Sequence, residues 1–180
     1  MLVAYESLFG ATRLIAEAIT EGLFEGGADS VCRGICDVRA LEPGPFEFLV
    51  LGAPTHARSL PTFASRREGT RWLENRMHGK SLDPCATELG LREWIPQASL
   101  AGRRIAAFTT RADLPRLLAG SAVHAIERLA RAQGARTIDP GFAARVDEHG
   151  DLLPGEEDLA RDWGRALAAR VAPREAVARG

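Results

Sequence analysis

The chain has 180 residues and a formal net charge of −1, which suits one domain with a sizeable core. A net charge near zero, with no basic run interleaved with aromatic residues, argues against nucleic acid as a partner. The apolar runs are too short to cross a bilayer, and Met1 leads straight into an apolar segment without a signal-peptide pattern. We therefore expect a cytoplasmic protein with no membrane partner, one domain over residues 1–172 and a tail at 173–180.

The first 23 residues predict a strand, a turn and a helix in that order. Residues 1–5 are apolar and lack helical spacing, as in a strand buried on both faces of a parallel sheet. Apolar residues then recur every three or four positions, which predicts a helix, at Ile15, Ala18, Ile19, Gly22 and Leu23. The glycines Gly26 and Gly27 indicate where this helix ends.

The turn before that helix carries two hydroxyl groups, a glycine and no charge; its residues are Ser7, Leu8, Phe9, Gly10, Ala11 and Thr12. The first N–H groups of a helix lack internal partners and lie at the positive end of its dipole, so they attract an anion. Gly10 allows close approach of the backbone to a ligand, and Ser7 and Thr12 can donate hydroxyl groups. The pattern predicts a phosphate site, but it also fits an ordinary turn in which Thr12 caps the helix.

Strand-like and helix-like segments alternate along the rest of the chain. Further strands are predicted over residues 31–38, 46–52, 104–109 and, more weakly, 135–139. One helix is predicted over 122–130 with Gly134 as its stop, and a last helix should bury a face of Leu159, Trp163, Ala166, Leu167 and Arg170. This alternation predicts a parallel sheet covered by helices on both faces. Ligands bind beyond the carboxyl ends of such strands, which here are followed by the polar segments 6–12, 53–57 and 109–113.

Five segments, taken in order, resemble a flavodoxin-family domain of the actinobacterial kind: YESLFGAT, LVLGAPTHARSLP, LREWI, AAFTTR and PGEEDLARDWGRAL. The resemblance covers nearly the whole chain. It implies a flavodoxin-like, doubly wound five-stranded parallel sheet of order 2-1-3-4-5 with helices on both faces. It also implies FMN bound where the first and third strands diverge, a rule for which flavodoxins are a standard example.

The resemblance assigns the phosphate to the turn after the first strand. The family pattern of hydroxyl, any residue, hydroxyl, Gly, Asn and hydroxyl falls on residues 7–12, where Ser7, Gly10 and Thr12 match it. Phe9 replaces a hydroxyl and Ala11 replaces an amide, so two side-chain hydrogen bonds of about 1 kcal/mol net each are missing. The backbone N–H groups remain able to bind a phosphate.

The isoalloxazine ring would lie between two loops, formed by Pro54, Thr55, His56 and Ala57 after the third strand and by Thr109, Thr110 and Arg111 after the fourth. Neither loop has the Phe, Tyr or Trp that flavodoxins usually place there. His56 could stack on the ring, donate to it or pass it a proton, or it could serve only to hold its own loop. Arg111 could bind the pyrimidine edge or an acidic substrate, or form a surface salt bridge. Phe9, Trp72 or Trp94 are alternative covers for the ring.

Two further features have structural interpretations. Residues 58–101 form a longer connection than a crossover needs. They are either a lid or partner surface anchored by Trp72 or Trp94, or a helix and a short second helix whose Leu91, Trp94 and Ile95 pack on the sheet. The cysteines Cys32, Cys36 and Cys85 lack zinc-site spacing, and the first two lie too far apart along one strand to bridge. We therefore expect buried free thiols and no metal site.

The resemblance and the residues together predict an FMN-binding redox protein, either an electron carrier or a small FMN-dependent oxidoreductase. Hydrolase motifs and the three-glycine dinucleotide fingerprint are absent, so NAD(P)H is expected only as a visiting electron donor. The redox partner, protein or small molecule, is not specified by any motif. The alternative is a flavodoxin-like binding or regulatory module that has lost flavin.

Overall fold

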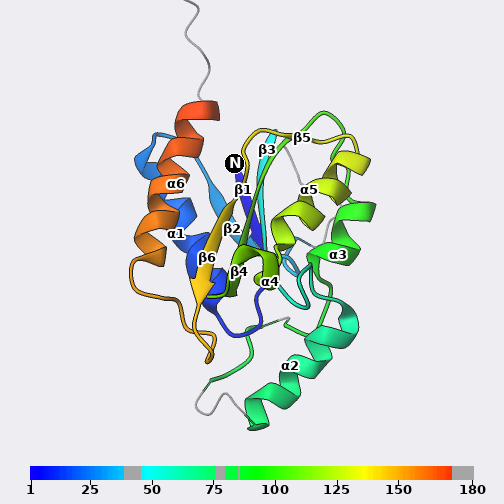
Figure 1. The fold of residues 1–180 in the computed structure, drawn as a ribbon. Coiled ribbons are helices and arrows are strands. Elements are labelled where there is room, and N and C mark those ends of the chain that lie inside the picture. The colour runs from blue at the N-terminus through cyan, green and yellow to red at the C-terminus, as the bar shows by residue number, and fades with distance from the viewer. Residues whose placement is uncertain (39–45, 76–79, 85, 172–180) are drawn as a thin grey trace, which may run out of the picture.

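A computed structural model describes residues 1–38, 46–75, 80–84 and 86–171. The sheet has the predicted order, β2-β1-β3-β4-β5, and all its strand pairs are parallel (Figure 1). Its strands are β1 Leu2–Tyr5, β2 Val31–Gly34, β3 Phe48–Pro54, β4 Arg104–Ala112, β5 Arg136–Thr137 and β6 Phe142–Val146. Its helices are α1 Ala11–Glu25, α2 Phe63–Asn75, α3 Leu91–Trp94, the 3₁₀ helix η1 Ile95–Gln97, α4 Arg116–Ala119, α5 Ala122–Ala132 and α6 Glu156–Val171. The predicted fold class is confirmed; the predicted tail at 173–180 lies outside the described residues.

The last position of the sheet differs from the prediction. The segment predicted as a strand over 135–139 pairs with β4 only at Arg136 and Thr137, and an unpredicted strand, β6, then continues beside the second half of β4. Asp139 lies in the interruption between β5 and β6 and stabilises it. Its carboxylate accepts hydrogen bonds from the Gly141 N–H at 2.8 Å, from Trp163 Nε1 at 3.0 Å and from Arg170. Two of these donors come from α6, so the chain beyond the sheet decides where β6 begins.

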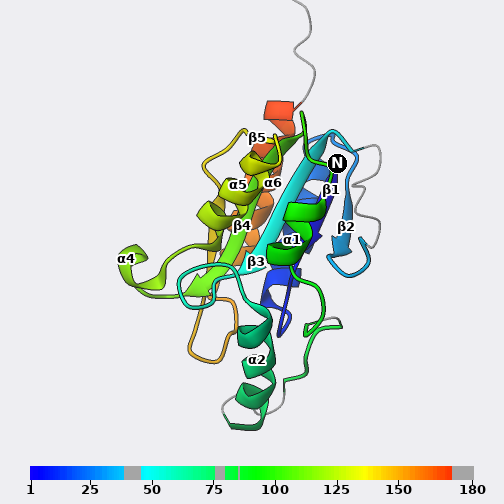
Figure 2. The same cartoon turned by 90° about the vertical axis from the view of Figure 1, so that its right-hand side faces the viewer.

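The helices form two layers. α1 and α6 cover one face of the sheet and α3 and α5 cover the other (Figures 1 and 2). α1 and α6 cross so closely that a Cβ on Gly22 would lie 2.0 Å from the Arg161 carbonyl oxygen. This crossing buries Ala160, Gly164, Leu167 and Ala168, whereas Leu159 is 52% exposed. The predicted face of the last helix is therefore wrong at Leu159, Ala166 and Arg170, which are all exposed, because small residues make the contact.

The second part of the 58–101 connection, α3 and η1, packs on the sheet and is not a lid over the candidate site. Leu91, Trp94 and Ile95 are fully buried on the sheet, as the packing interpretation predicted, and Trp94 Nε1 donates to the Val38 carbonyl oxygen at 3.3 Å. Trp94 is therefore not a cover for the predicted ring site. Nothing is described of the Trp72 side chain. α2 extends beyond the carboxyl ends of the strands (Figure 2).

The cysteine prediction is wrong for Cys36, which is disulfide-bonded. It assumed a strand running to residue 38, but β2 ends at Gly34 and Cys36 lies in the turn that follows. Cys32 is free and half-buried, and burial raises the pKa of its thiol. Across the described residues, no group of His, Cys, Asp and Glu side chains could hold a metal ion. Within the same part of the chain, no helix is both long and apolar enough to cross a bilayer.

Candidate functional site

A cavity of about 220 Å³ lies where the loops after β1, β3, β4 and β6 meet. This is the carboxyl edge of the parallel sheet, where such sheets bind ligands. Every predicted site residue except Gly10 and Thr109 lines it. The lining consists of Ser7, Leu8, Phe9, Ala11, Thr12, Pro54, Thr55, His56, Ala57, Thr110, Arg111, Ala112, Val146, Asp147, Glu148 and Gly150.

The loop after β1 presents the N-terminus of α1 to this cavity. Gly10 is the N-cap, with φ of 98°, and no side chain caps the helix. The interpretation of Thr12 as a cap is therefore wrong: Thr12 lies inside the helix, and its hydroxyl bonds the Thr110 hydroxyl at 2.8 Å. The Ser7 hydroxyl accepts the Gly10 N–H at 3.1 Å and closes the turn. The first-turn amides of a 15-residue helix thus open beside the cavity, the geometry that binds anions.

The loop after β3 contains a strained turn. The N–H of His56 donates to the Ser59 carbonyl oxygen at 2.9 Å. The N–H of Ser59 donates to the His56 carbonyl oxygen, also at 2.9 Å. Between them Ala57 and Arg58 have φ of 44° and 70°, a conformation that costs a residue with a side chain roughly 1–2 kcal/mol. Gly120 packs against this turn so closely that a Cβ there would lie 2.4 Å from the Arg58 Cα. The surrounding structure therefore holds the turn in its strained form.

His56 is a neutral ring in the cavity wall. Burial, together with the charge of Arg66, lowers the pKa of its imidazole to about 4. At neutral pH the ring carries no charge, so it is available to stack or to hydrogen-bond but is not a cationic proton donor. The backbone of His56, through its two bonds with Ser59, is what closes the turn.

The polar residues after β4 divide into those that line the cavity and those that brace it. Thr109 is fully buried behind the wall, where its hydroxyl donates to the Ala53 carbonyl oxygen at 2.7 Å and bonds the Thr55 hydroxyl at 2.8 Å. Thr109 therefore links β3 to β4 rather than facing a ligand. Arg111 Nη1 donates to the Leu114 carbonyl oxygen at 2.8 Å. Its Nε is buried and finds no acceptor among the described residues.

The wall contributed by β6 and its loop was missed from the sequence. It supplies Val146, Asp147, Glu148 and Gly150, because β6 lies beside β4 at the same edge. The Asp147 carboxylate accepts the N–H groups of His149 at 2.8 Å and Asp151 at 2.9 Å, and these backbone bonds lower its pKa. An aspartate followed within a few residues by a glycine is a turn signal, but only the unpredicted pairing of β6 places this turn at the site.

The comparisons with known proteins bear on the fold. No protein-family model and no curated protein matches this chain. Solved structures do match. Oxidised flavodoxin 1 from Bacillus cereus is 17% identical with a TM-score of 0.63, over 96% of this chain and 98% of its own. A flavodoxin from the domain Archaea is 16% identical with a TM-score of 0.60, over 94% and 96%. The flavodiiron protein from Giardia intestinalis is 16% identical with a TM-score of 0.58, over 94% of this chain and 35% of its own. The chain thus has the flavodoxin-like fold, with its cavity at the carboxyl edge of the sheet.

Proposed function

We propose that the chain binds FMN in this cavity and works as a redox protein, as an electron carrier or a small FMN-dependent oxidoreductase. The observation that carries the proposal is the uncapped N-terminus of α1, which opens onto a cavity walled by the loops after β3 and β4. Positive helix ends with unoccupied amides favour a phosphate group. The flavodoxin-like fold and the loop pattern of residues 7–12 support FMN as the phosphate carrier.

In this proposal the loop of Ser7–Thr12 binds the phosphate, mainly through backbone N–H groups. Gly10 contributes its conformation, and Ser7 and Thr12 contribute hydroxyls that also bond within the protein. Phe9 and Ala11 lack the side-chain donors of the family pattern, which should weaken binding by about 2 kcal/mol, or roughly thirtyfold. We therefore expect a measurable but reduced affinity for FMN.

The flavin ring would lie against the walls formed by residues 54–57, Thr110, Arg111 and the loop of β6. Phe9 and His56 are the flat side chains of the cavity lining, so they take the place of the usual aromatic pair. Arg111 Nε is a buried donor without an acceptor in the part of the chain that the structure describes, as expected of a group that binds a ligand carbonyl. When bound, the flavin supplies one- or two-electron transfer; the residues of the chain orient it and limit its contact with water.

The test is a titration of the purified protein with FMN, followed by flavin fluorescence. Gly10→Ala should abolish binding, because an alanine does not adopt a φ of 98° without moving the first-turn amides. Gly102→Ala is the matched control: it has a φ of 76° and open space around it, but it precedes β4 at the opposite edge of the sheet. Equal affinities of the two variants would contradict the proposal.

A flavin-free binding module is the second candidate, favoured by the poor match at Phe9 and Ala11. A colourless protein that gives no fluorescence change with added FMN would support it and overturn the FMN proposal. If FMN does bind, stopped-flow reduction by NADPH with a quinone acceptor separates the two redox roles. Turnover indicates an oxidoreductase, and reduction only by another redox protein indicates a carrier.

A further inference from the structure

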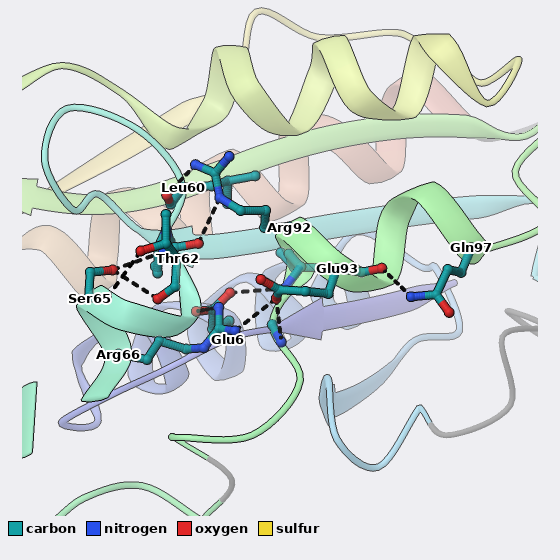
Figure 3. Close-up of polar contacts among 11 residues, drawn as sticks. Glu6, Leu60, Thr62, Ser65, Arg66, Arg92, Glu93 and Gln97 are labelled. Carbon is teal, nitrogen blue, oxygen red and sulfur yellow. Dashed lines mark hydrogen bonds and ion pairs between the residues drawn. The ribbon is translucent and has the colours of Figure 1, made fainter. Parts of the chain in front are cut away.

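A buried ionic cluster lies under the loop that begins the candidate site. Arg66 from α2 is 1% exposed and pairs through Nη1 with Glu6 Oε1 at 3.4 Å and through Nη2 with Glu93 Oε2 at 2.8 Å (Figure 3). Glu6 is itself buried and directly precedes Ser7. The cluster therefore joins the end of β1 to α2 and α3, two helices of the long connection between β3 and β4.

The backbone around the cluster is shaped to hold it. Glu6 Oε2 accepts the Leu91 N–H at 2.9 Å, and Glu93 Oε2 accepts the Gly90 N–H at 3.1 Å. A Cβ on Gly90 would lie 2.4 Å from Arg66 Nη1 and 2.6 Å from Glu6 Oε2, so only glycine leaves room for the ion pair. A buried carboxylate without its cation is strongly unfavourable, which makes the three side chains interdependent.

The same helix supports the anion loop directly. Gly69 lies on α2 one turn after Arg66, and a Cβ there would lie 2.5 Å from Leu8 Cδ2. The Leu8 carbonyl oxygen also accepts the Asp83 N–H at 2.8 Å. The loop is thus fixed at Glu6 by the cluster. At Leu8 it is fixed by α2 and by the stretch at Asp83, which both belong to the connection between β3 and β4. Arg66 does not line the cavity, so it does not contact a ligand there.

We propose that Arg66 is a positioning residue that fixes the amides of residues 7–12 for a phosphate, and so sets the selectivity of the site for FMN over riboflavin. This inference rests on the proposed function. Arg66 acts in two ways: it anchors α2 against Leu8, and it neutralises the Glu6 carboxylate, which would otherwise repel a phosphate bound at the adjacent loop. The hydrogen bonds that hold the loops after β3 and β4, between His56 and Ser59 and between Thr55 and Thr109, do not include the residues of the cluster.

The experiment compares the affinities of FMN and riboflavin by fluorescence titration, for the native chain and for Arg66→Lys. Lysine keeps the charge but cannot bond both carboxylates with a planar fork. We expect the affinity for FMN to fall about tenfold or more, the size of one lost charged hydrogen bond, and that for riboflavin to stay unchanged. Arg161→Lys is the control, because Arg161 bonds Glu21 across the α1–α6 crossing, away from the cavity.

A second measurement needs no ligand. Amide hydrogen exchange of residues 7–12 should accelerate in Arg66→Lys and stay as in the native chain in Arg161→Lys. If Arg66→Lys does not fold, Glu93→Gln weakens the same cluster at its more exposed carboxylate, 33% exposed, and should shift both readouts in the same direction. If the native protein prefers FMN and Arg66→Lys keeps both this preference and the native rate of amide exchange, the inference about Arg66 is overturned and the proposed function is not. A native protein that binds neither flavin overturns the proposed function and the inference with it.

Discussion

Replacing His56 by glutamine should remove part of the acid sensitivity of the fold. The imidazole has its pKa lowered from 6.5 to about 4, first by burial and then by the charge of Arg66. The unfolded chain therefore takes up a proton near pH 6.5, whereas the folded chain resists it until about pH 4. The unfolded state gains relative stability as the pH falls through this window. Above pH 6.5 the imidazole is neutral in both states and contributes nothing.

The size of the effect follows from the two pKa values. A shift of one pKa unit corresponds to 1.36 kcal/mol, so the full penalty below pH 4 is about 3 kcal/mol. Between about pH 7 and pH 4.5 the native chain should lose about 2 kcal/mol of unfolding free energy through His56 alone. Burial raises the pKa of Glu6, which has the opposite effect on stability at low pH. Because His56→Gln keeps Glu6, the difference between the two proteins isolates the imidazole.

The assay is urea unfolding at both pH values, followed by tryptophan fluorescence. His56→Gln should lose about 2 kcal/mol less than the native chain on acidification. If the two proteins lose the same free energy, the imidazole is not protected from protonation in the folded state, and its assignment as a neutral wall of the cavity is wrong.

Three further changes test other parts of the structure by the free energy of unfolding. Ala57→Gly should stabilise the chain by about 1 kcal/mol, because glycine relieves the strained φ. The control, Ala166→Gly in the exposed middle of α6, should destabilise the chain by about 1 kcal/mol. If both variants are less stable than the native chain, the backbone at Ala57 is not strained. Gly52→Ala should cost about 1–3 kcal/mol, since its Cβ would lie 2.0 Å from the Phe108 ring. Rescue by Phe108→Leu is expected, and its failure would argue against a clash. Asp139→Ala should lower the free energy of unfolding by about 2 kcal/mol or more, because it leaves three hydrogen-bond donors unpaired. Asp139→Asn should lower it by less. If the two variants lose the same free energy, the charge of Asp139 matters and the geometry of its hydrogen bonds does not.

Local patterns in the sequence were sufficient to predict the layers of the fold and the edge of the sheet at which the polar loops meet. Buried strands and helices differ in the spacing of their apolar residues, so the alternation of the two predicted a parallel sheet covered by helices on both faces. The carboxyl ends of parallel strands share one edge, which is why Ser7, Thr55 and Thr110 were expected together. These inferences need only the period of a segment and the turn that follows it.

Other features depended on contacts between segments far apart in the chain. β6 begins where it does because Asp139 is bonded by α6, and Thr109 turns away from the cavity because its hydroxyl donates to the Ala53 carbonyl oxygen and bonds the Thr55 hydroxyl. The charge state of His56 depends on its burial and on Arg66 in another helix. The local sequence pattern determines whether a segment forms a helix or a strand and where that element ends. Which side chains become buried together, and therefore which hydrogen bonds and charges must be satisfied, is decided only when those elements pack.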